Sequence, residues 1–404
     1  MTDRSSTFLS DMAEATRLTR AGRLTEATAL IQRSLGAPGM GPEASAADRA
    51  APRLEARIEA GAEAAHEALI PQRLRENIDQ MMRGLRTLAP SLKGLVGGGL
   101  HAPSPDGVEP EDGQFVARSF SNAAGARDYK LFVPSPRAGS RPLLVMLHGC
   151  TQSPDDFAAG TRMNALAEEE GIYVVYPRQS RRANAQKCWN WFEPGDQGRE
   201  MGEAGIVAGI VRAVCAEHPI DRSRIYIAGL SAGGAAAANI ARAYPDLFAA
   251  VGVHSGLAAG CARDLPSALS AMRVGAPGAS APGGAAGFGA GSVTQSLRVP
   301  TIVVHGEGDG TVHPRNAEAV LAQAGVESLT PRQETGNGGG HSYTRTRYAD
   351  ETGRVQVEAW SVQGAGHAWS GGSPEGSYTD PNGPDASRAM LDFFLGHSLP
   401  GRTG

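Results

Sequence analysis

The sequence predicts an α/β fold with a mainly parallel, doubly wound sheet, preceded by a helical N-terminal segment. Short apolar runs typical of buried strands recur along the second part of the chain, and patterns with helical spacing separate most of them. The expected strands cover residues 143–147, 172–176, 225–228, 250–254, 301–304 and 356–362, and the expected helices cover 155–170, 201–218, 232–243, 314–324 and 385–395. This alternation is typical of parallel sheets that are covered by helices on both faces.

Residues 1–95 are expected to form the helical N-terminal segment. Apolar residues recur at helical spacing over 8–18 and again over 24–35, and the pair resembles half of a tetratricopeptide array. Residues 44–88 have room for one or two more helices. A single hairpin is too short to form a solenoid, which needs about three repeats. The apolar faces of these two helices therefore need a partner surface, on the same chain, on a second subunit or on a separate binding partner.

The main domain is expected over residues 114–399. A linker at 96–113, rich in Gly, Pro and acidic residues, precedes it. Alternating polar and apolar residues over 114–119 and 127–133 predict an opening antiparallel pair of strands. The stretch 262–296 is rich in Gly, Ala, Ser and Pro, so we expect a mobile loop there in place of an ordered lid.

The most informative motif is Gly229-Leu-Ser231-Ala-Gly233, which reads G-x-S-x-G. A short β-branched strand precedes it and an alanine-rich helical run follows it. This strand–turn–helix context is what the nucleophile elbow of α/β-hydrolases requires. Small residues flank the serine because the turn is tight, and the helix directs its first N–H groups toward the reacting atoms. Ser231 is the predicted nucleophile.

A nucleophilic serine needs a base, and the base needs an acid to orient it. Asp309 and His367 follow Ser231 in the chain order of α/β-hydrolases, and each lies on a loop after a predicted strand. Ligand-facing groups gather at the carboxyl ends of strands in such sheets. We therefore predict Asp309 as the acid and His367 as the base. Glu307 and His313 are the rival candidates, and His305, at the end of a strand, is expected to be structural.

The oxyanion of an acyl-transfer intermediate needs two N–H donors. The helix after the nucleophile supplies one, from the backbone of Ala232. A predicted strand ends at His148-Gly149-Cys150, where the glycine permits close approach of the backbone to the substrate. The backbone N–H of Cys150 is the predicted second donor.

The serine motif, extended to Gly234, and four segments of the chain together resemble the polyhydroxybutyrate depolymerase family of esterases. The segments that carry the resemblance are His148-Gly-Cys-Thr-Gln152, Cys188-Trp-Asn-Trp-Phe192, Gly364-Ala-Gly-His-Ala-Trp-Ser-Gly-Gly372 and Ser377-Tyr-Thr-Asp-Pro381. The resemblance covers roughly residues 114–399. It implies serine esterase chemistry on short-chain hydroxyalkanoate esters. Because the family also includes acetyl- and feruloyl-polysaccharide esterases, those activities are the alternative.

Three of the four tryptophans, Trp189, Trp191 and Trp369, lie in the motif segments. They could form an apolar platform for an ester chain, or they could pack in the core. Trp369 is the strongest candidate for substrate contact because it lies two residues from His367.

Composition excludes several functions. The formal net charge is −4 and the pI is about 6.2, so nothing indicates a nucleic-acid partner. No C-x-x-C spacing is present, and we expect no metal and no other cofactor. The sequence contains no run of about 18 apolar residues, so no membrane span is predicted. Charged residues interrupt the first 20 positions, so no secretory signal is predicted.

The absence of a predicted signal leads to a cytoplasmic expectation, or to a secreted protein if the N-terminus was trimmed. Cys150 and Cys188 could pair in an oxidising compartment, but in the cytoplasm we expect free thiols. The expected partner is an ester substrate, which could be polymeric. A second hypothesis makes the chain a binding protein, whose N-terminal helices would contact a polymer granule or form a homo-oligomer.

Overall fold

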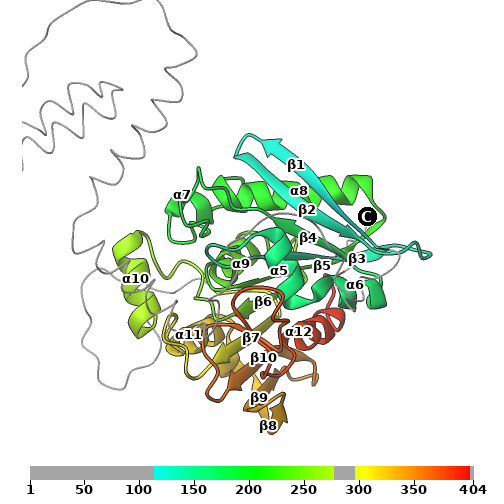
Figure 1. Ribbon diagram of the computed structural model, residues 1–404. Coiled ribbons are helices and arrows are strands. Elements are labelled where there is room, and N and C mark those ends of the chain that lie inside the picture. Colours follow the sequence, from blue (N-terminus) through cyan, green and yellow to red (C-terminus); the bar gives the residue numbers. More distant parts are fainter. Residues whose placement is uncertain (1–112, 277–295, 401–404) are drawn as a thin grey trace, which may run out of the picture. The chain divides into compact units, whose positions relative to one another are not determined.

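The structure is a computed structural model that describes residues 113–276 and 296–400. Its central feature is a ten-stranded sheet (Figure 1). The strands follow the order β1-β2-β4-β3-β5-β6-β7-β10-β9-β8. They are β1 (Gln114–Asn122), β2 (Gly125–Val133), β3 (Arg141–Leu147), β4 (Tyr173–Pro177), β5 (Ile220–Leu230), β6 (Ala250–His254), β7 (Thr301–Gly306), β8 (Thr330–Gly338), β9 (His341–Ala349) and β10 (Val355–Val362). The six central strands from β4 to β10 are parallel, and antiparallel pairs extend both edges.

Helices cover both faces of the sheet (Figure 1). They are α5 (Pro154–Thr161), α6 (Met163–Glu170), α7 (Pro194–Gln197), α8 (Gly202–Glu217), α9 (Ala232–Ala243), α10 (Leu265–Val274), α11 (Arg315–Gln323) and α12 (Ala386–Leu395), with a 3-10 turn at Val326–Ser328 and two short strands, β11 (Trp369–Ser370) and β12 (Thr379–Asp380). One core cluster joins α8, α9, α10 and α11 to the sheet, and the other joins α5, α6 and α12. Alternate residues of β3 point into the two clusters, as a strand with two covered faces requires.

The predicted doubly wound α/β fold is confirmed, and most elements lie where the sequence placed them. The opening strands pair antiparallel in register, from Gln114 opposite Val133 to Asn122 opposite Gly125. One predicted helix is divided in two: Arg162, whose φ of 52° is left-handed, separates α5 from α6. The periodicity continues across this break, so the apolar pattern alone does not show it.

Several elements were not predicted, and the longest are the β8–β9 hairpin and helix α10. The hairpin of β8, which is mostly exposed, and β9, which is half-buried, lies in a mostly polar stretch without the apolar alternation that indicates a half-buried strand. Helix α10 lies inside the stretch expected to be a mobile loop, where Asp264 and Ser267 form a capping box that starts the helix. That expectation is therefore wrong for α10, while residues 277–295 lie outside the described residues.

The described helices include none that is long and apolar enough to cross a membrane. The predictions for the N-terminal segment at 1–95 and for most of the linker at 96–113 lie outside the described residues. The fold places the candidate site at the carboxyl ends of the parallel strands. The parallel strands β3, β5, β7 and β10 each run directly into a segment that carries a predicted site residue.

Candidate active site

Ser231 lies at the sharp turn between β5 and α9 with φ 57° and ψ −120°. This left-handed φ is unfavourable for a residue with a side chain, and such conformations persist at functional sites when the surroundings enforce them. The flanking glycines are required by space. A Cβ on Gly229 would clash with the backbone of Gly233, and a Cβ on Gly233 would clash with the backbone of Leu147 and His148. The G-x-S-x-G pattern thus describes a turn packed against the end of β3.

Asp309 and His367 form a hydrogen-bonded pair on neighbouring loops. His367 Nδ1 lies 2.7 Å from Asp309 Oδ2, and the two side chains are 6% and 0% exposed. The other carboxylate oxygen accepts the backbone N–H groups of Thr311 at 2.9 Å and Val312 at 2.8 Å. Burial alone would raise the pKa of Asp309, but hydrogen bonds from His305 and His367 outweigh burial and hold the pKa well below its usual range. The carboxylate is therefore ionised.

Backbone hydrogen bonds fix the two loops to each other. Glu307 N donates to Val362 O at 2.9 Å, and Gly308 N donates to Ala365 O at 2.9 Å. A Cβ on Gly306 would clash with Ala365 O, so glycine permits this approach. The Asp309–His367 distance is consequently set by backbone contacts on both sides.

The rival candidates occupy other positions. Glu307 Oε1 accepts a hydrogen bond from Ser361 Oγ at 2.7 Å in an exposed setting. His313 Nδ1 accepts the backbone N–H of Arg315 at 3.2 Å, also in an exposed setting. Neither makes a hydrogen bond with His367 or Ser231 among the described residues. The geometry therefore favours Asp309 and His367 over both.

His254, at the end of β6, attaches the serine turn to the histidine loop. Its carbonyl oxygen accepts Ser231 N at 2.9 Å, and its Nε2 accepts Ser370 N at 3.0 Å. Complete burial lowers the pKa of His254 to about 3, so its ring is neutral and can accept this hydrogen bond. No direct hydrogen bond joins Ser231 Oγ to His367 within the described ranges. Catalytic hydrogen bonds are commonly longer before substrate binds.

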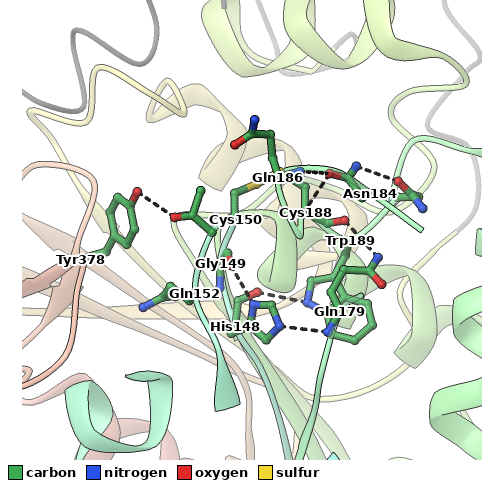
Figure 2. Close-up of a disulfide and its surroundings, with 12 residues drawn as sticks. His148, Gly149, Cys150, Gln152, Gln179, Asn184, Gln186, Cys188, Trp189 and Tyr378 are labelled. Atoms are coloured by element: carbon green, nitrogen blue, oxygen red, sulfur yellow. Dashed lines mark hydrogen bonds between the residues drawn. A yellow bond between two sulfur atoms is a disulfide. The ribbon is translucent and has the colours of Figure 1, made fainter. Parts of the chain in front are cut away.

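Hydrogen bonds from side chains hold the backbone of the segment from His148 to Gln152 in place (Figure 2). Trp189 Nε1 donates to His148 O at 3.0 Å, and the Gln152 side chain accepts Gly149 N at 2.8 Å. The Cys150 N–H has no partner within the described ranges, and Ala232 opens helix α9 with its N–H in the first turn. Both groups are available to an incoming oxyanion.

The His148 ring carries part of this support. Burial lowers the pKa of His148 to about 4, which leaves the imidazole neutral. Its Nε2 accepts Gln179 N at 3.1 Å, so Nδ1 bears the proton and donates to Gly149 O at 2.7 Å.

A disulfide joins Cys150 to Cys188, 38 residues apart in sequence (Figure 2). The expectation of free thiols at these two positions is therefore wrong. The bond connects the candidate oxyanion donor to the segment that supplies Trp189. Cys215 and Cys261 are free.

The three tryptophans predicted to contact substrate are core residues. Trp189 and Trp369 are 0% and 1% exposed, and Trp191 is 5% exposed. Trp369 stacks on His254 with ring centroids 4.8 Å apart and donates Nε1 to Ser387 Oγ at 2.9 Å. Such burial favours the core-packing alternative over the substrate-platform role for all three.

Several supporting residues were not singled out from the sequence. Glu203 is buried under the disulfide segment and accepts Asn190 N at 2.8 Å, and its carboxylate also contacts Gln179. Burial and the nearby Asp196 raise the pKa of Glu203 to about 7. No local pattern marks Glu203, since it lies in an ordinary helical run. Tyr378 had a signal, because it belongs to the motif at 377–381, and its hydroxyl lies 3.0 Å from Thr151 Oγ1.

Comparisons with known proteins identify the family of the chain. The chain is 35% identical over 239 residues to poly(3-hydroxyalkanoate) depolymerase C of Paucimonas lemoignei, covering 58% of this chain and 56% of that protein. It is 27% identical over 289 residues to poly(3-hydroxybutyrate) depolymerase of Ralstonia pickettii, covering 67% and 57%. The chain thus spans a little more than half the length of these two relatives. Feruloyl esterase B of Thermothelomyces thermophilus is 31% identical over 250 residues, which cover 59% of this chain and 82% of that protein.

The solved structure of an acetyl xylan esterase from Aspergillus awamori matches with a TM-score of 0.52 and 20% identity, covering 70% of this chain and 99% of that one. This likeness shows the fold. Residues 127–329 match the family model described as esterase PHB depolymerase. The chain belongs to this esterase family, within the α/β-hydrolase superfamily.

Proposed function

We propose that this chain is a serine esterase that hydrolyses short-chain hydroxyalkanoate esters of the polyhydroxybutyrate type. The observation that carries the proposal is the 2.7 Å hydrogen bond between His367 and a buried, ionised Asp309, on loops that adjoin the strained turn at Ser231. Depolymerase relatives support the substrate class.

The reaction begins with attack of Ser231 Oγ on the acyl carbonyl carbon. Its proton passes to His367 Nε2, which is free because Nδ1 is occupied by Asp309. The N–H groups of Cys150 and Ala232 stabilise the oxyanion, as preorganised donors do without reorganising during the reaction.

Collapse of the intermediate breaks the bond between the acyl carbon and the alcohol oxygen. His367 returns its proton to that oxygen, and the alcohol leaves. Water then attacks the acyl-enzyme and gives a proton to His367. The bond between the acyl carbon and Ser231 Oγ then breaks, His367 returns that proton to Ser231 Oγ, and the hydroxy acid leaves. Asp309 stabilises the imidazolium in both halves of the reaction.

A polysaccharide esterase is the second candidate function. The feruloyl esterase B relative favours it, because this chain covers 82% of that protein. The same triad serves either acyl group, so the two functions differ only in what surrounds the acyl chain and the alcohol.

Parallel assays separate the two functions. Purified protein is given 3-hydroxybutyrate oligomers, an acetylated xylan and a feruloyl ester, with the Ser231→Ala variant as the blank. We expect kcat/KM to be highest on the oligomers. A higher kcat/KM on either polysaccharide ester would replace the proposed substrate class while leaving the triad chemistry in place.

We also propose that the domain works in an oxidising compartment rather than in the cytoplasm, as first expected. The disulfide between Cys150 and Cys188 supports this proposal, since reduced thiols are the rule in the cytoplasm. Alkylation of the protein directly after cell lysis, followed by mass spectrometry, tests it. Alkylation of Cys150 and Cys188 would show that both thiols are reduced in the cell and would contradict this proposal.

A further inference from the structure

Asp309 is in contact with a second histidine besides His367. His305, next to the end of β7, is buried, and its Nε2 lies 3.4 Å from Asp309 Oδ2. This is the same carboxylate oxygen that lies 2.7 Å from His367 Nδ1. His305 Nε2 also lies 2.8 Å from Val312 O. Two imidazoles therefore share one oxygen of the acid.

The contacts determine the protonation of His305. A backbone carbonyl only accepts, so Nε2 bears the proton that it directs toward Val312 O. Nδ1 is buried without a hydrogen-bond partner among the described residues. A proton on Nδ1 would be a buried N–H without a partner, whereas the Nε2–H tautomer leaves only a lone pair unsatisfied there. The contacts therefore fit the Nε2–H tautomer.

His305, Val312 and Asp309 form a closed set of contacts. Val312 O accepts from His305, and Val312 N donates to Asp309 Oδ1 at 2.8 Å. The loop between β7 and α11 is thereby fixed at the backbone of Val312 and at both carboxylate oxygens. The titratable groups around this set are His254 on β6 and His367 after β10, and burial keeps His254 neutral.

We propose that His305 is a positioning residue for the triad: its Nε2–H holds the Val312 carbonyl and Asp309 Oδ2 so that the carboxylate is aligned with His367 Nδ1. This role rests on the proposed function, because it matters only if Asp309 and His367 act together. A purely structural His305 would fill space at the end of β7 and would not influence the Asp309–His367 hydrogen bond.

The unaltered protein provides the first test. Selective ¹⁵N labelling of histidine reports which ring nitrogen carries the proton. We expect His305 as the Nε2–H tautomer and His367 as the Nδ1–H tautomer with a downfield-shifted proton. An Nδ1–H tautomer at His305 would overturn the proposal, because no proton would then be directed toward Asp309.

Two variants provide the second test. His305→Phe keeps a ring of similar size and removes the donor, whereas His305→Gln keeps an N–H donor at nearly the same reach. We expect kcat of His305→Phe to fall about 10- to 100-fold with KM changed by less than about twofold, as for loss of a hydrogen bond to a charged group. We expect His305→Gln to retain kcat within about fivefold and to keep the downfield His367 proton near its wild-type position.

The result that overturns the proposal is an unchanged kcat and an unmoved downfield proton in His305→Phe, or equal losses in both variants. Thermal unfolding of each variant accompanies the kinetics. If His305→Phe does not fold, the tautomer in the unaltered protein and the kcat of His305→Gln decide. Ser231→Ala in the same assay separates this outcome from failure of the proposed function, since activity retained there would disprove the triad itself.

Discussion

Four residues around the candidate active site have a strained backbone. Ser231, Thr151, Lys187 and Tyr378 all have left-handed φ angles, of 57°, 67°, 53° and 54°. Lys187 and Tyr378 both contact Thr151 in the oxyanion segment (residues 148–152): Lys187 Nζ donates to Thr151 O at 3.0 Å, and Thr151 Oγ1 lies 3.0 Å from the Tyr378 hydroxyl. Such conformations each cost about 1–3 kcal/mol and persist where surrounding contacts enforce them. The fold thus maintains a strained shape on both sides of the reacting atoms.

Replacing the acid should separate Asp309 from its neighbour Glu307. Asp309→Asn should lower kcat by about three orders of magnitude or more, because an amide supports neither the imidazolium nor the correct tautomer of His367. Glu307→Gln is the matched control and should retain kcat within about threefold, since Glu307 bonds only Ser361 in an exposed setting. Steady-state kinetics measures both. A larger loss in Glu307→Gln would move the acid to that residue.

The buried His254 ring should make stability depend on pH. Its pKa falls from 6.5 to about 3 on folding, so between these values the unfolded chain binds a proton that the folded chain does not. The free energy of unfolding therefore rises with pH across this window, by up to about 1.4 kcal/mol per pH unit.

His254→Gln isolates this effect, because glutamine can still accept the Ser370 N–H but does not titrate. Urea unfolding at pH 4.5 and pH 7 should show a difference in stability that is smaller in the variant by about 2 kcal/mol. His148 acts in the same direction and Glu203 in the opposite one, and both are common to the two proteins. Equal differences in wild type and variant would refute the predicted titration.

At the scale of elements, the disulfide and the hydrogen bonds of the oxyanion segment should act together. Cys188→Ala removes a cross-link across 38 residues, and the free energy of unfolding should fall by about 2–4 kcal/mol. The kcat should fall as well, because the N–H of Cys150 then lies on a segment that is less firmly held. Denaturant unfolding and ester kinetics measure the two effects.

Cys215→Ala is the control, since Cys215 is a free and partly exposed thiol. It should leave both the stability and kcat close to those of wild type. A Cys188→Ala variant that matched Cys215→Ala in stability and kcat would show that the bond does not support the site.

The elements that the sequence predicted are those whose own residues carry the signal. Strand β6 and helix α9 have the predicted bounds because a buried apolar run and an alanine-rich run are unambiguous. The pair β8 and β9 was missed, since its residues are mostly polar and the pairing of β9 with β10 depends on tertiary contacts. The predicted triad positions rested on motif order and strand ends, which are local properties.

The supporting contacts depended on information that is not local. Trp189 and Trp369 were judged by their distance in sequence from the motifs, whereas their burial is decided by helices and loops elsewhere in the chain. The contacts of Glu203 and the contact of His305 with Asp309 likewise follow from the packing of separate elements. The sequence alone therefore indicates the candidate catalytic residues but not the residues that position them.

At the scale of the whole molecule, deletion of residues 1–110 should leave hydrolysis of a small soluble ester nearly unchanged. The family match begins at residue 127, and each proposed catalytic group lies beyond residue 141. Kinetics on p-nitrophenyl butyrate, beside an assay on insoluble polymer, measures the effect. Loss on the polymer alone would support a granule-binding role for the N-terminal segment. Equal loss on both substrates would show that the segment supports the fold, and the granule hypothesis would be dropped.

The central claim is that ester cleavage proceeds through an acyl-enzyme on Ser231. Acid quenching during turnover of p-nitrophenyl butyrate, followed by peptide mass spectrometry, tests it most directly. We predict a butyryl group on the peptide that contains Ser231, and neither this adduct nor activity above about a thousandth of wild type in Ser231→Ala. An acyl group on another residue, or wild-type turnover by Ser231→Ala, would contradict the account.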